Sequence, residues 1–135
     1  MTLAFDRNIE ATELLLNVIL QRKDLRVMEV VAQREYKNPM SNGRSITIDI
    51  CAEDGDGRIY DIEVKRASSG ADSHRARFHS SMIDTKMLKA GQKFKEIHDS
   101  YVIFITARDV IGAGCPLYHI DRVIKETGVY FGDGS

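Results

Sequence analysis

Three residues in the middle of the chain, Asp49, Glu63 and Lys65, have side chains that can act together on a phosphate group. Two carboxylates whose Cβ atoms lie about 5 Å apart can share one hard divalent cation such as Mg²⁺. An ammonium group beside them can stabilise negative charge on a phosphate or help to activate an attacking water. This chemistry requires residues that are distant in the sequence to meet, which depends on the elements that carry them.

Two runs of alternating apolar and polar residues predict a β-hairpin over residues 45–66. One face is expected to carry the apolar side chains and the other the polar ones; the apolar set is Ile46, Ile48, Ile50, Tyr60, Ile62 and Val64, and the other set includes Ile59, Asp61, Glu63 and Lys65. Residues 53–57, with two glycines, supply the turn. A slip of one residue would point one apolar set the wrong way. A loop of three or five residues centred on Asp56 is therefore predicted, and it places Asp49 opposite Glu63.

Directly opposed carboxylates destabilise a sheet, so the predicted pairing of Asp49 with Glu63 calls for a compensating charge. A bound cation supplies one such charge. The competing interpretation is an ordinary hairpin with one wet face, which shows the same alternation.

Residue spacing predicts the remaining elements. An amphipathic helix is expected over residues 9–22, and a helix rich in Arg, His and Ser over residues 71–88. A strand is expected over residues 24–34, and the apolar run 101–106 is typical of a strand buried on both faces. Residues 117–124 and 129–131 are expected to form short strands. This order indicates an α/β fold in which helices flank a mixed sheet.

The 135 residues, 43% hydrophobic and 29% charged, fit a single domain that spans residues 1–135. Cys51 and Cys115 are expected to be reduced thiols of a cytoplasmic protein, since nothing resembles a signal peptide or a membrane span. The net charge of −1 argues against coating nucleic acid by bulk charge. The charge is unevenly spread, however, because a mostly acidic segment 45–64 adjoins a mostly basic segment 65–98. Such blocks could hold a cation next to a polyanion.

Two other metal sites are not favoured by the sequence. A partial calcium loop around Asp54 and Asp56 has Ala52 at its first ligand position, and its flanks alternate as strands do. His74 and His79 lack the spacing of a zinc-binding pair, so structural zinc is not expected.

Two arginines of the second predicted helix, Arg75 and Arg77, are the residues expected to contact the phosphates of a nucleic acid. The reason is that this helix follows the strand end that carries Lys65.

Four segments, together with Asp49, resemble the bacterial PD-(D/E)XK nuclease family transposases, which are akin to the recombination-promoting nucleases. The segments are NIEATELLL at residues 8–16, IYDIEVKR at 59–66, RARFHSSMID at 75–84 and YVIFIT at 101–106. The similarity extends over nearly the whole chain. It implies a restriction-endonuclease-like fold with an αβββαβ core.

The resemblance also implies roles for the residues that match the family motif. Asp49 and Glu63 would be metal ligands for Mg²⁺ or Mn²⁺, the backbone carbonyl of Val64 a third ligand, and Lys65 the catalytic base or charge stabiliser. Glu13 matches an acidic position that assists the metal or water in many members, although a solvated helix residue is the simpler interpretation.

Two features depart from the family pattern. Ile48, and not proline, precedes Asp49. Lys65 stands where many close relatives have Gln, which favours an intact catalytic site. Family members also look longer, so the chain is expected to be truncated at its C-terminus.

The sequence therefore predicts a metal-dependent DNA endonuclease of low sequence specificity, linked to recombination or mobile elements. A homodimer is compatible with this prediction, because two copies related by a two-fold axis can cut both strands of a duplex. The alternative is a non-catalytic domain that keeps the nuclease fold and serves in DNA binding or protein association.

Overall fold

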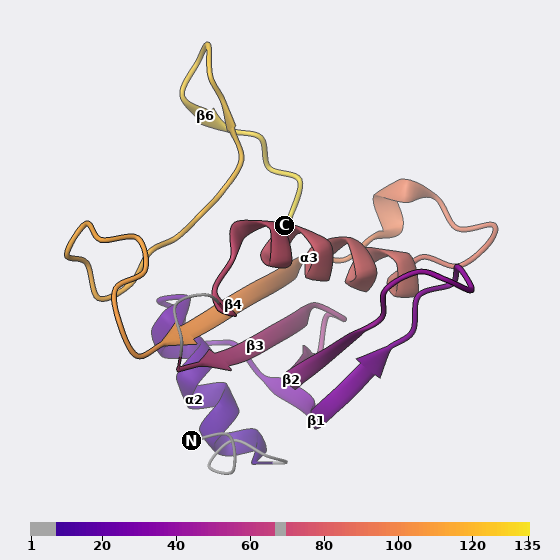
Figure 1. Ribbon diagram of the computed structural model, residues 1–135, viewed down its shortest axis with the longest axis horizontal. Helices are drawn as coiled ribbons and strands as arrows, with labels where there is room; N and C mark the ends of the chain where they lie inside the picture. Colours follow the sequence, from indigo (N-terminus) through magenta and orange to yellow (C-terminus); the bar gives the residue numbers. More distant parts are fainter. Residues whose placement is uncertain (1–7, 67–69) are drawn as a thin grey trace.

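The computed structural model describes residues 8–66 and 70–135. Most of the first ten residues, on which the exclusion of a signal peptide partly rests, lie outside this range. Figure 1 shows a sheet with the strand order β1-β2-β3-β4 and two helices, α2 and α3, packed on it. The first three strands are antiparallel, and β4 is parallel to β3. The predicted mixed sheet and αβββαβ order are confirmed.

Helix α2 spans Ile9–Ile19 and ends earlier than predicted. It begins at Asn8, whose side chain accepts a hydrogen bond from the amide of Ala11 at 2.9 Å. It ends because Gln21 has a left-handed backbone with φ of 54°. This conformation lets the amides of Gln21 and Arg22 bond back to the last turn, which is the usual stop signal of a helix.

Strands β2 (Ile46–Asp54) and β3 (Ile59–Lys65) form the predicted hairpin. The pairs Ile50↔Ile62 and Glu53↔Ile59 confirm the predicted register, with five residues, 54–58, between the last two paired residues. Gly57, with φ of 81°, makes the turn possible.

The apolar side chains of β1 (Val27–Tyr36) and β2 change from one face of the sheet to the other about halfway along the paired strands. Gln33 has φ of 52°, and it lies between Ala32 and Arg34, which pair with Ile50 and Ile48. Val30, Ile50 and Ala52 pack in the cluster around Leu16 of α2. Tyr36, Ile46 and Ile48 pack, together with Cys51, in the cluster around Ile83 of α3. The strict alternation had predicted that Ile46, Ile48 and Ile50 share one face. In the structure Ile46 and Ile48 instead pack in a different cluster from Ile50.

Helix α3 spans Ser73–Met87 and is capped by the side chain of Asp72. Its buried residues, His79, Met82 and Ile83, cover the face of β3 that the competing hairpin interpretation left in water. The carboxylates Asp61 and Glu63 on that face are fully buried, with 0% exposure. The wet-face interpretation is therefore wrong for this part of the hairpin.

Strand β4 spans Ser100–Thr106 and pairs only with β3 in the described sheet. Residues 101–106 are half-buried on both faces, so the expectation of a strand fully buried on both faces is wrong; β4 lies at the edge of the sheet and has one neighbouring strand. Tyr101 stacks on Tyr60, with ring centroids 5.1 Å apart. The short helix η2 (Phe94–Glu96) lies between α3 and β4 in the chain.

Residues 107–135 form a largely exposed arm that loops away from the sheet in Figure 1 and returns, so that the C-terminus lies beside α3. Only β5 (Val123–Ile124) and β6 (Val129–Tyr130) are regular, and they pair with each other. The predicted strand 117–124 is thus reduced to its last two residues. Within residues 8–66 and 70–135, no helix is long and apolar enough to cross a membrane.

Candidate active site

Asp49 and Glu63 meet where β2 and β3 separate. The amide of Asp49 donates to Glu63 Oε2 at 2.8 Å, and the amide of Val64 donates to Asp49 Oδ2 at 3.2 Å. Each carboxylate thus binds the backbone of the opposite strand, beyond the last regular pair, Ile50↔Ile62. These reciprocal bonds hold both carboxylates in the seam between the strands.

Lys65 closes this group from the end of β3. Its Nζ lies 3.5 Å from Asp49 Oδ2 and 3.4 Å from Glu63 Oε1, and its side chain is only 16% exposed. Since residues two apart on a strand share a face, Lys65 projects on the same side as Glu63. The structure thus brings together the three side chains that the sequence singled out.

Glu63 is the most deeply placed of the three, with no exposed side-chain surface. Burial raises the pKa of its carboxyl to about 7, and the nearby carboxylates of Asp61 and Asp49 add to the rise; the Asp49 amide opposes it. Its Oε1 atom has no hydrogen-bond partner within the described part of the chain. A buried carboxyl in this state favours an additional positive charge beside it.

The carbonyl of Val64 faces the same seam. In an extended strand, the N–H and C=O groups of one residue point to the same side. Because the Val64 amide donates to Asp49, the Val64 carbonyl is directed toward Asp49 as well. Two carboxylates and one carbonyl are therefore available as oxygen donors.

The two arginines expected to contact nucleic acid take different positions. Arg75 Nη2 lies 3.8 Å from Glu63 Oε1, and the buried Nε of Arg75 has no partner in the described residues. Arg77 is exposed and, two residues further along α3, projects from a different side of the helix. Only Arg75 joins the carboxylate group.

Glu13 does not join this group. One of its carboxylate oxygens binds Arg26 at 2.8 Å, and the other accepts a hydrogen bond from the Val27 amide at 3.0 Å. It ties α2 to the start of β1 and is 23% exposed.

Two buried residues that sequence reasoning did not select complete the site. Asp61 lies two residues before Glu63 on β3, and its Oδ2 is 2.6 Å from Nδ1 of His79 on α3. The available signals were the i, i+2 spacing of the two acids and the i, i+4 spacing of Arg75 and His79, which places those two on one helix face.

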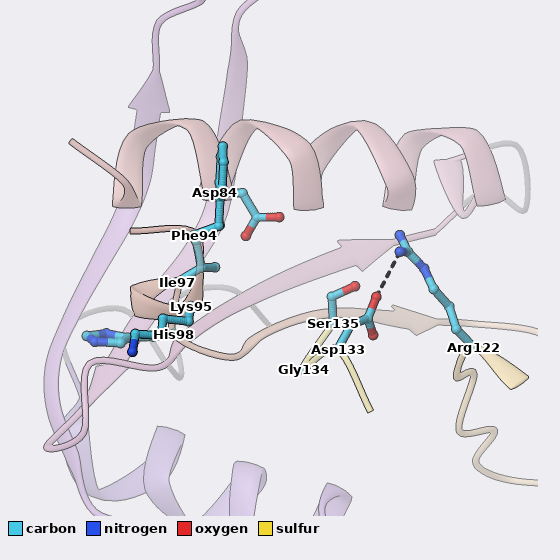
Figure 2. Close-up of a pocket in the computed structure, with 9 residues that line it drawn as sticks. All are labelled: Asp84, Phe94, Lys95, Ile97, His98, Arg122, Asp133, Gly134 and Ser135. Carbon is cyan, nitrogen blue, oxygen red and sulfur yellow. Dashed lines mark hydrogen bonds and ion pairs between the residues drawn. The ribbon is translucent and has the colours of Figure 1, made fainter. Parts of the chain in front are cut away.

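A cavity of about 320 Å³ lies elsewhere, between α3, the segment 94–98 and the end of the arm (Figure 2). Its lining includes Asp84, Lys95 and His98, and the Arg122–Asp133 ion pair of 2.8 Å borders it. None of the carboxylates in the β2–β3 seam lines it. The chemically suited group is thus separate from this cavity.

An αβββαβ core with acids and a lysine gathered on its central hairpin defines the restriction-endonuclease-like class of α/β proteins. A comparison with protein families agrees, because the model described as PD-(D/E)XK nuclease family transposase matches residues 3–127 of the 135. The chain belongs to this family, which indicates a nuclease- or transposase-like function. No curated protein and no solved structure matches the chain.

Proposed function

We propose that this protein is a metal-dependent endonuclease that hydrolyses phosphodiester bonds in DNA with Mg²⁺ or Mn²⁺. One observation carries the proposal: the carboxylates of Asp49 and Glu63 converge from adjoining strands, and the Lys65 ammonium lies within 3.5 Å of both. In a family described by the words nuclease and transposase, this arrangement favours catalysis over a purely structural ion pair.

The residues fit a divalent cation. Asp49, Glu63 and the Val64 carbonyl offer only oxygen donors, the set that Mg²⁺ prefers. Oε1 of buried Glu63 makes no hydrogen bond within the described residues, and a cation bound there would add to the positive charges of Lys65 at 3.4 Å and Arg75 at 3.8 Å. A cation bound there would neutralise charge on the scissile phosphate and favour ionisation of an attacking water. Glu13 is not included, because Arg26 and Val27 already engage its carboxylate.

Lys65 and Arg75 supply the positive charge of the protein itself. Lys65, which lies within 3.5 Å of both carboxylates, would orient water or stabilise charge on the phosphate. Arg75 has a 40% exposed side chain, and its buried Nε makes no hydrogen bond to the described residues; it would bind a phosphate oxygen.

The substrate proposed is DNA, cut with low sequence specificity. The basic segment 65–98 and exposed Arg77 would contact phosphates, and phosphate contacts carry no direct sequence information. A homodimer would place two such sites on opposite strands of a duplex. The proposed setting is recombination or the movement of mobile elements, following the family description.

Nicking of supercoiled plasmid tests the proposal. We expect nicking with Mg²⁺ or Mn²⁺, none with a chelator, and a loss of at least about 100-fold in Lys65→Ala, the scale for removing one charge-stabilising group. Lys37→Ala, which removes an exposed lysine just after β1, is the matched control and should keep wild-type activity. Full activity in Lys65→Ala would remove the catalytic assignment.

A gel-shift assay distinguishes the non-catalytic alternative. A DNA-binding domain without catalysis would retain binding in a chelator and in Asp49→Asn, and would show no nicking under any metal.

A further inference from the structure

A second group of metal-binding side chains lies beside the proposed nuclease site. Asp61 and Glu63 project from the same face of β3, and His79 reaches them from α3. One ligand atom from each of the three lies within 4.8 Å of the others. All three residues are buried, with exposures of 0%, 0% and 2%.

The polar atoms of this group are incompletely satisfied. Asp61 Oδ2 is bonded to His79, but Asp61 Oδ1 and Glu63 Oε1 have no hydrogen-bond partner in the part of the chain that the structure describes. Lys65 and Arg75 lie near Glu63, whereas no lysine or arginine among the described residues forms an ion pair with Asp61. A buried carboxylate without sufficient compensation destabilises the fold.

A hydrogen bond between His79 and Asp61 that only anchors α3 would explain half of this arrangement. It engages Oδ2 of Asp61 and leaves Asp61 Oδ1 without a hydrogen-bond partner among the described residues. A cation between the three side chains would engage Asp61 Oδ1, and it would explain why two acids share a buried face.

We propose that Asp61, Glu63 and His79 form a binding site for a divalent transition metal, Mn²⁺ or Zn²⁺, next to the all-oxygen site at Asp49 and Val64. The imidazole makes the difference, because nitrogen ligands suit transition metals while Mg²⁺ favours oxygen alone. The two sites share Glu63, but metal binding at His79 does not require that the neighbouring site be catalytic.

Electron spin-echo envelope modulation of the Mn²⁺-loaded protein tests this site without any substitution. Nitrogen-14 modulation from a coordinated imidazole is expected in the wild-type protein, because His79 is the nitrogen ligand. Absence of this modulation at saturating Mn²⁺ overturns the proposal.

Variants then identify the nitrogen. His79→Gln should abolish the modulation and weaken Zn²⁺ binding, measured by calorimetry, at least about tenfold. Loss of a residue that only supports a ligand already weakens metal binding about tenfold or more, and loss of a direct ligand should cost at least as much. His74→Gln, on the exposed first turn of the same helix, is the matched control and should change neither. Modulation that persists in His79→Gln overturns the proposal as well.

Asp49→Asn separates this proposal from the nuclease assignment. It removes a ligand of the all-oxygen site alone, so the nitrogen signal should remain while Mg²⁺-supported nicking is lost. A nitrogen signal in a wild-type protein that never nicks DNA would refute the nuclease and leave the His79 site standing. Nicking without a nitrogen signal would refute the His79 site and leave the nuclease assignment standing.

Discussion

The buried carboxyl of Glu63 makes the stability of the metal-free protein depend on pH, and Glu63→Gln should remove that dependence. The pKa of Glu63 rises from an ordinary value of 4.5 to about 7 because the folded protein buries the group beside Asp61. A carboxyl with a higher pKa in the folded state stabilises the fold while it is protonated. Its contribution is complete below pH 4.5 and is lost as the pH rises through about 7.

The size of the effect follows from the two pKa values. Their difference, at about 1.4 kcal/mol per pH unit, corresponds to about 3 kcal/mol as an upper limit. Glutamine stays neutral and keeps an acceptor for the Asp49 amide. The variant should therefore be more stable than the wild type at pH 8, by up to about 3 kcal/mol, and lose this advantage near pH 4.5.

Urea unfolding in EDTA at a series of pH values measures this difference. Subtracting the two curves cancels the other titrating groups, and Glu35→Gln, on the exposed side of β1, is the control that should show no such trend. A difference that stays constant between pH 4.5 and pH 8 would show that Glu63 does not titrate as its burial predicts. Added Mg²⁺ at pH 8 should stabilise the wild type far more than the variant, since a ligand that binds only the folded state raises its stability.

Three further substitutions test the scaffold by urea unfolding. Asp54→Ala should cost about 1–3 kcal/mol, because it leaves the buried Tyr60 hydroxyl, 2.7 Å away, without its acceptor; no loss would mean that water replaces the carboxylate. Gln21→Gly should stabilise by about 0.5 kcal/mol, because the left-handed backbone costs other residues more than glycine loses in entropy, and destabilisation would contradict this. Leu16→Ala should cost about 2–5 kcal/mol, whereas exposed Leu14→Ala should change stability by less than about 0.5 kcal/mol; equal losses would refute the burial argument.

The hairpin was predictable from the sequence because its constraints are local. Alternation has a period of two, and the turn around Asp56 leaves only one register that keeps Ile50 and Ile62 on the same face. Once that register is fixed, Asp49 and Glu63 must approach each other.

Contacts between elements that are distant in the sequence were harder to predict from the sequence. The polar residues on one side of β3 resembled a wet face, and only the packing of α3 reveals that Asp61 and Glu63 are buried against His79. A lone histidine on a helix carries no signal of its own. The same limit applies to β4, whose apolar sequence does not show how many neighbours the strand has.

The left-handed backbone of Gln33 on β1 bears on the orientation of Asp49 on the neighbouring strand β2. Ala32 and Arg34, on either side of Gln33, pair with Ile50 and Ile48, and these two isoleucines belong to different core clusters. Asp49 lies between them, where the faces change, and its Oδ2 accepts a hydrogen bond from the Val64 amide. The conformation of an edge strand thereby affects the orientation of a carboxylate on its neighbour. A β-branched residue at Gln33, which resists that backbone hand, would disturb the geometry of the acids and the division of the core together.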